Sequence, residues 1–559
     1  MRFITAITAF GVLLLVVSLV DYAGKVETPV SAPPSASATA ESDLKPAVAR
    51  LDQWFENYWK SERVTPSTPT DDLTVLRRLS LALFGTVPSL EEIRAFENDS
   101  APDRLDRWLV QMLKDARYGD YFSDRLSRSL VGVDQGPFIV FRRDQFNLWL
   151  SRQLQTDASW SQMTRDMIAA KGVWTDRPAA NFITIARVND EGLDVNKLAG
   201  RTVRTFLGQR IDCAQCHDHP FDKRWHQGDF EGLAAWYSHA GLSLAGVKEH
   251  EKNKDGTPVV YKVVDPGKAP EEARVINPAV PFHPEWLPAE GDQRERLAAW
   301  VTHPDNRRFE RAIANRIWGL MFGRPLHEPV DDLPHPEDKP EDALDILGQE
   351  FRARGDKLSV LIRMIAQSKA FRLSSESTAE TDSQYSAQES AWAVYPLIRL
   401  RPEQVIGSIF QASHIRSVDQ NSNPFIRFAR FNNENDFINE YGDLGDDELL
   451  QQIGTIPQAL LRMNGKFTSE QSKVDYLFLS GPAEILTFSK DDAHVVENSF
   501  LCCLSRRPTE AELEYYLNLL KQPEEDEPTP SGTVRPSRAE VVQDLFWTLY
   551  NSPEFSWNH

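Results

Sequence analysis

Cysteine is scarce in this sequence, with 4 among 559 residues. None of them lies near the N-terminus, which excludes a lipid-anchored cysteine there. Cys502 and Cys503 are adjacent in a helical context, and adjacent cysteines bridge each other only with strain, so we expect two small buried hydrophobic side chains. The other two, Cys213 and Cys216, lie in the segment CAQCHDHPFDKRW at residues 213–225. This segment could attach haem, hold a metal, carry reactive thiols or simply pack.

Basic residues are also fewer than acidic residues. Lysine and arginine number 62 and aspartate and glutamate number 82, which gives a formal net charge of -20 at pH 7. An acidic surface repels phosphate backbones and the headgroups of anionic lipids. We therefore expect no nucleic acid among the partners of this protein.

A repeat of fixed period is absent as well, and 559 residues are too many for one compact core. Hydrophobic residues make up 41% of the chain, which is enough apolar material to bury large cores. Two or three globular units are expected.

The N-terminus has the layout of an export signal. Residues 3–20 form an uncharged, mostly apolar stretch after one basic residue, Arg2. The stretch just reaches the length that spans a bilayer, and Asp21 and Tyr22 follow it without a clean cleavage site. We expect residues 1–23 to be a signal peptide or a membrane anchor, and favour an uncleaved anchor. The rest of the chain is then extracytoplasmic, in the periplasm or at the cell surface.

The folded part is predicted to be mainly α-helical. Residues 24–46 are rich in Pro, Ala and Ser and predict a disordered tether. Helical patterns then dominate, with capping boxes at Ser89 and Thr509. A helix that stops at Gly208 and another around Phe230 are expected to hold residues 213–225 as a loop between them.

The two helical domains are expected at residues 47–244 and 283–559. Between them, residues 245–282 change character, because the turn sequence Asp255-Gly256 stands next to a β-branched run. We interpret this junction as a small β-hairpin.

The segment CAQCH has the C-x-x-C-H spacing of covalent haem attachment. In such sites two thiols, here Cys213 and Cys216, reach the vinyl groups, and the adjacent histidine, His217, ligates the iron as the proximal ligand. The second axial ligand is not evident from the sequence. The candidates are His219, His226 and His239.

The same segment supports two metal-based alternatives. Cys213, Cys216, His217, His219 and Asp222 supply enough ligands for a tetrahedral zinc ion. Metal-dependent hydrolysis would use His217, His219 and Asp222, although the segment follows the end of a helix and not a strand.

Two further alternatives need no metal. Cys213 and Cys216 could form a disulfide or a redox dithiol in an oxidising compartment, but the βαβ context of a thioredoxin-like module is missing. The loop could also merely pack, with His219 and Trp225 as core residues.

Several longer segments resemble known families. The segments LRRLSLALFGTVPSLEEIRAF, ARYGDYF and FLGQRIDCAQCHDHPFDKRWHQGDFEGLAAWY resemble the planctomycete secreted cytochrome-like domain of unknown function. The segments HPDNRRFERAIANRIWGLMFGRPLHEPVDDL, ALLRMNGKF, LSRRPTEAELE and LYNSPEFSWNH resemble the partner domain that follows it. The resemblance spans residues 48–559. The sequence departs from it at residues 122–133, where a segment with a histidine is usual.

The resemblance implies an exported, mostly helical protein with a cytochrome-like haem motif, carried by Cys213, Cys216 and His217. It implies no defined activity. Our leading hypothesis is a c-type cytochrome-like protein with haem c, which exchanges electrons with a redox partner or an envelope protein. The alternatives are a noncatalytic or metal-stabilised envelope interaction protein and a metal-dependent hydrolase. No residue is predicted to be catalytic.

Overall fold

The computed structural model describes residues 43–133, 141–188, 192–243, 245–265, 267–422, 449, 456–476, 480–521 and 536–559. The predicted export segment and most of the tether lie outside the described residues, and so the predicted anchor does too. Within the described ranges, no helix has the length and apolar character needed to cross a membrane. The last residues of the predicted tether are helical, because the first described helix begins at Lys45.

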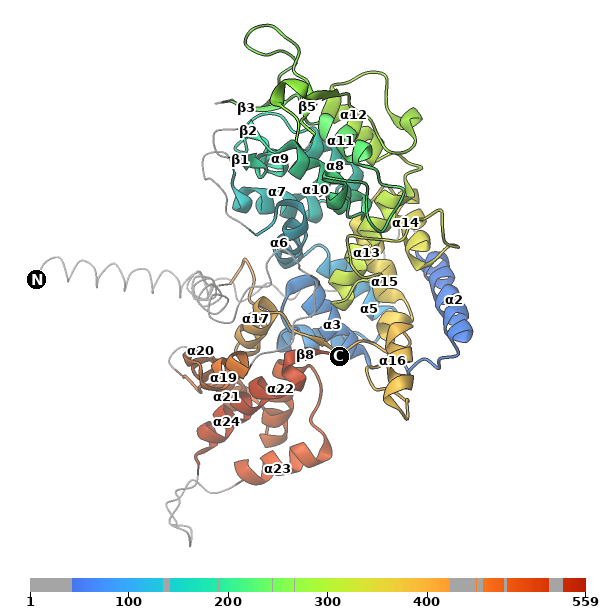
Figure 1. Ribbon diagram of the computed structural model, residues 1–559. Coiled ribbons are helices and arrows are strands. Elements are labelled where there is room, and N and C mark those ends of the chain that lie inside the picture. Colours follow the sequence, from blue (N-terminus) through green and yellow to red (C-terminus); the bar gives the residue numbers. More distant parts are fainter. Residues whose placement is uncertain are drawn as a thin grey trace, which may run out of the picture.

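The described chain is mainly α-helical, which confirms the predicted fold class (Figure 1). The helices up to the motif loop are α2 Lys45–Glu62, α3 Asp72–Phe84, α4 Leu90–Asn98, α5 Arg104–Met112, α6 Ala116–Val131, α7 Arg143–Gln155, α8 Trp160–Ile168, α9 Asn181–Thr184 and α10 Val195–Leu207. Those after it are α11 Gln227–Ala235, α12 Gln293–Val301, α13 Arg307–Phe322, α14 Ala343–Ala353, α15 Leu358–Gln367, α16 Asp382–Ser390, α17 Pro402–Ala412, α19 Ile456–Asn464, α20 Lys466–Gln471, α21 Gly481–Phe488, α22 Asp492–Leu504, α23 Glu510–Leu520 and α24 Arg538–Asn551. The predicted capping boxes at Ser89 and Thr509 are present.

The strands of the described residues form four small antiparallel sheets of two strands each. They are β1 Arg187–Val188 with β2 Gly192–Leu193, β3 Ala240–Ser243 with β4 Gly246–Glu249, β5 Tyr261–Val263 with β6 Arg274–Ile276, and β7 Ile398–Arg399 with β8 Trp557–Asn558. The last sheet joins the end of the chain to a segment far back in the sequence.

The predicted hairpin at the junction is partly wrong. A turn does lie at Asp255-Gly256, where Gly256 has a φ of 85° and a single bridge joins Lys252 to Pro258. However, β5 pairs with β6 and not with the residues before the turn. At this turn the N–H of Asn253 donates to the carbonyl oxygen of Thr257 at 2.8 Å, and the N–H of Val259 donates to that of Glu251 at 2.9 Å. Pro258 lies between these two bonds, at a position that needs no N–H donor.

Helix α13 lies at the centre of the larger core. All its residues from Phe309 to Phe322 are buried, and the helix packs against α3, α10, α14 and α15 (Figure 1). The rings of Phe55 and Trp318 stack with centroids 5.7 Å apart, which joins α2 to α13. This core contains residues from both sides of the junction at 245–282, so the two helical regions share one apolar interior.

A second core gathers α17, α22 and α24, which lie at one end of the molecule in Figure 1. Helix α3 connects the two cores, because Leu79 belongs to the first and Leu81 to the second. Cys502 and Cys503 are free and buried in this second core, which confirms the prediction for them. The domain boundaries proposed from the sequence stay a prediction.

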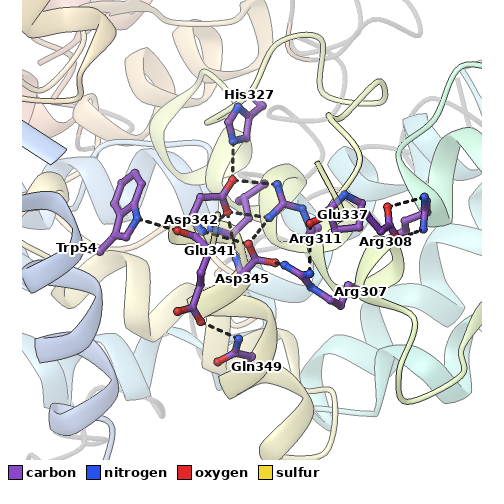
Figure 2. Close-up of polar contacts among 12 residues, drawn as sticks. Trp54, Arg307, Arg308, Arg311, His327, Glu337, Glu341, Asp342, Asp345 and Gln349 are labelled. Carbon is purple, nitrogen blue, oxygen red and sulfur yellow. Dashed lines mark hydrogen bonds and ion pairs between the residues drawn. The ribbon is translucent and has the colours of Figure 1, made fainter. Parts of the chain in front are cut away.

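A buried polar network fixes the segment between α13 and α14 (Figure 2). Arg311 donates to Asp342 Oδ1 at 2.8 Å and Oδ2 at 2.9 Å, and to Asp345 Oδ2 at 2.6 Å. The side chain of Asp342 also caps α14, and His327 Nε2 lies 3.1 Å from Asp342 Oδ2. The connecting segment, residues 323–342, is therefore attached to α13 through Arg311 and to α14 through the cap at Asp342.

The two arginines bonded to Asp345 should differ in their contribution to stability. Arg311→Met should lower the free energy of unfolding by about 3–5 kcal/mol, because it leaves carboxylates buried without their main cation. Arg307 is the matched control: it also bonds Asp345, at 2.7 Å, but is half-exposed. Arg307→Met should cost less than about 1 kcal/mol. Urea unfolding measures both values, and an equal loss would contradict this account of the network.

Candidate functional site

The motif segment is a loop mounted between two helices, as predicted. Helix α10 ends at Gly208, whose φ of 61° favours glycine, and α11 begins at Gln227. A short 3-10 turn, Asp212–Gln215, carries the first cysteine. Ala214 and Trp225 are buried and attach the two ends of the loop to the core.

Both thiols of the motif are available for reaction. Cys213 and Cys216 are free and exposed, while Ala214 between them faces the core. The N–H of Cys216 lies 3.5 Å from the carbonyl oxygen of Cys213, so the two residues share one turn. This donor set fits covalent attachment, which needs two thiols that a planar group can reach from solvent.

His217 is exposed and has a defined ring orientation. Its Nδ1 lies 2.7 Å from the carbonyl oxygen of Asp218, and since a carbonyl only accepts, Nδ1 donates the proton. In the neutral ring Nε2 then carries the lone pair. Such a bond on the second nitrogen is common in histidines that ligate metals. The geometry therefore fits a proximal ligand that binds through Nε2.

Two other predicted ligands, His219 and Asp222, are instead hydrogen-bonded to other groups of the protein. His219 Nδ1 accepts the backbone N–H of Asp222 at 2.9 Å, so the ring proton of the neutral form lies on Nε2. Asp222 Oδ1 accepts from the backbone and the Nε of Arg224, both at 3.1 Å, and Oδ2 lies 2.5 Å from His335 Nε2. Either residue would have to give up these bonds to bind a metal.

The two remaining candidate histidines have other partners. His226 is exposed at the start of α11, and its Nδ1 is 3.5 Å from Asp218 Oδ2. His239 Nε2 contacts the carbonyl oxygen of Val259 at 3.2 Å. Among the residues that the structure describes, no three His, Cys, Asp or Glu side chains are placed to hold a metal ion together.

The contact with His335 was missed by sequence reasoning. His335 is buried and lies 113 residues along the chain from Asp222. Burial alone would raise the pKa of Asp222, but the hydrogen bonds from His335 and Arg224 outweigh it and lower this pKa to about 2. The only local signal was a histidine within the acidic segment DDLPHPED, and this pattern does not indicate its partner.

Thiol alkylation distinguishes the two cysteine pairs. In haem-free protein, brief alkylation should modify Cys213 and Cys216 and spare Cys502 and Cys503, because burial raises the pKa of the Cys502 thiol to about 12 and that of Cys503 above its ordinary value. Peptide mass spectrometry before and after addition of urea measures this. Modification of all four at similar rates under native conditions would contradict the described burial.

Two families match the chain in succession. Residues 50–241 match PSCyt2, described as a protein of unknown function (DUF1549), and residues 293–441 match PSD1, described as a protein of unknown function (DUF1553). The first match contains the motif loop and the second contains His335. Neither a curated protein nor a solved structure matches the chain. The predicted resemblance is confirmed: the chain carries a PSCyt2 match followed by a PSD1 match, in the predicted order.

Proposed function

We propose that this protein is an exported c-type cytochrome-like protein that attaches haem through Cys213 and Cys216. The observation that supports this most directly is the pair of free, exposed thiols next to His217, whose Nδ1 donates to a carbonyl. The S–H of each thiol would add across a vinyl group, so that no atom is released. When bound, the haem would take up and release single electrons.

The residues of the loop would hold and orient this group. The buried side chains of Ala214 and Trp225 keep the loop ends in place. The bond from His217 Nδ1 to Asp218 orients the ring and increases the basicity of Nε2, which suits an iron ligand. Among the candidates for the second axial position we favour the exposed His226 over His219, because the one lone pair of the neutral His219 ring already accepts the N–H of Asp222.

A pyridine haemochrome spectrum tests the attachment. Protein matured in a host with haem-attachment machinery should carry covalent haem, and the double variant Cys213→Ala/Cys216→Ala should carry none. His217→Ala should keep part of the covalent haem but with an altered Soret band, because attachment and axial ligation are separate bonds. Cys502→Ala is the matched control and should leave the spectrum unchanged, since this buried thiol lies in the second core.

Two outcomes would contradict the proposal. Matured protein without covalent haem would show that the motif is not an attachment site. Zinc at one ion per chain, with no Soret band and with loss of stability on chelation, would instead favour the metal-stabilised alternative.

We also propose that the protein is extracytoplasmic and held at a membrane by its N-terminal segment. Residues 3–20 support this because they are uncharged, mostly apolar and just long enough to span a bilayer. The full chain should sediment with membranes, whereas a chain without residues 1–23 should stay in the supernatant. A soluble mature protein that begins between residues 19 and 30 would contradict the anchor and indicate a cleaved signal peptide.

A further inference from the structure

The motif loop has little apolar contact with the body of the protein. Between the buried Ala214 and the buried Trp225, none of the side chains of residues 215–224 is buried, and Phe221 is 90% exposed. Loops with few buried apolar contacts open at a low free-energy cost. The position of this loop therefore depends on its hydrogen bonds and ion pairs.

Residues 331–338, here named the strap, make many of those polar contacts. The strap lies in the segment between α13 and α14, within the PSD1 match. Three side chains of the strap are buried: Asp331, Leu333 and His335. Two of these, Asp331 and His335, are titratable. The proposed haem attachment uses none of these three residues.

The strap is hydrogen-bonded to the start of the motif loop, and through Gln209 it is linked to the end of the loop at Trp225. At the start of the loop, the N–H of Leu333 donates to the carbonyl oxygen of Gly208 at 2.7 Å. Gln209 Nε2 donates to the carbonyl oxygen of Leu333 at 2.6 Å, and Gln209 Oε1 accepts from Trp225 Nε1 at 3.3 Å. A Cβ on Gly208 would lie 3.0 Å from the Leu333 side chain, which shows how close the two segments are.

Charged side chains of the strap extend these contacts along the loop. Asp331 accepts from Arg210 at 2.7 Å, and Asp338 accepts from Arg224 at 2.6 Å. Between these two ion pairs, His335 Nε2 lies 2.5 Å from Asp222 Oδ2. The strap thus contacts the loop before the C-x-x-C-H motif, at residues 208–210, and after it, at Asp222 and Arg224.

The contact from His335 to Asp222 has a fixed direction. Arg308 of α13 lies 2.8 Å from His335 Nδ1, and a guanidinium can only donate, so Nδ1 is the acceptor. The ring proton is therefore on Nε2 and is donated to Asp222. Arg308 is itself held by Glu337 of the strap, at 2.8 and 2.9 Å (Figure 2). Asp222 in turn donates its backbone N–H to His219, which lies two residues after His217.

We propose that the strap of the second domain positions the motif loop for haem, with His335 as the main positioning residue. This inference rests on the proposed function, because it states what sets the place of His217 relative to the attachment cysteines. The haem site is then incomplete without the PSD1 domain. It follows that the two domains act as one unit at this site.

The test compares His335→Leu, which removes the donor, with His335→Gln, whose amide N–H can replace Nε2. The control is His494→Leu, which alters an exposed histidine of α22 paired with Asp491. In haem-free full-length protein, His335→Leu should raise the hydrogen-exchange rates of amides in residues 215–224 by about tenfold or more, the effect of losing a hydrogen bond to a charged group. His335→Gln and His494→Leu should leave these rates within about twofold of the unmodified protein.

In haem-loaded protein, His335→Leu should shift the Soret band and the midpoint potential, while His335→Gln restores both. Unchanged exchange rates in His335→Leu would overturn the inference. Faster exchange with an unchanged spectrum and potential would also overturn it, because the strap would then hold the loop without positioning His217. If the protein carries no haem, the proposed function fails, but the exchange rates still decide whether the strap holds the loop.

If His335→Leu fails to fold, a second pair of variants tests whether the strap holds the motif loop. Asp338→Asn breaks the ion pair with Arg224, whose two side chains are about half-exposed, and Arg224→Gln breaks this pair and the bond to Asp222, so neither change endangers the fold. Each should raise exchange at residues 221–224, and Asp338→Asn should add little once Arg224→Gln is present. No rise in either variant would overturn the inference.

Discussion

Buried arginine side chains are the constraint on which the rest of this structure depends. Arg77, Arg78, Arg294 and Arg311 are completely or almost completely buried, and a buried cation is costly unless hydrogen-bond acceptors surround it. Their acceptors come from distant segments. Arg77 donates to the carbonyl oxygens of Cys503 and Phe555, and Arg78 donates to those of Phe371, Leu373 and His559. Arg294 donates to the carbonyl oxygens of Ile168 and Ala170, and Arg311 donates to the carboxylates of Asp342 and Asp345. Each guanidinium thus joins the helix that carries it to segments elsewhere in the chain. Burial lowers the pKa of Arg77 and of Arg78 to about 10, which is high enough for both to stay charged at neutral pH.

Polar contacts that start from an arginine of the larger core also position the motif loop. Arg308 lies on α13, the central helix of the larger core, and its guanidinium reaches His335, which reaches Asp222 on an otherwise exposed loop. Polar contacts can position a segment without covering it, so Cys213 and Cys216 stay open to solvent while the backbone around them is held. A site that must accept a large planar group and still orient a histidine needs both properties.

Local features of the fold were predictable from the sequence, because they depend on residues that are close together in the chain. The caps at Ser89 and Thr509, the helix end at Gly208 and the burial of Cys502 and Cys503 all follow from short patterns. The pairing of β5 with β6 was not predictable from the turn at Asp255-Gly256, because both strands follow this turn in the sequence. The contact of His335 with Asp222 could not be inferred at all, because periodicity and spacing carry no signal for a pairing across 113 residues.

The central claim is that Cys213 and Cys216 carry haem, and the tryptic peptide between Arg210 and Lys223 tests it most directly. Trypsin releases residues 211–223, which contain both cysteines and His217. For protein purified from its native membrane or envelope fraction, the account predicts one peptide of this sequence that carries the added mass of one haem and absorbs in the Soret region. Recovery of the same peptide unmodified, with two free thiols or with a disulfide between them, would contradict it.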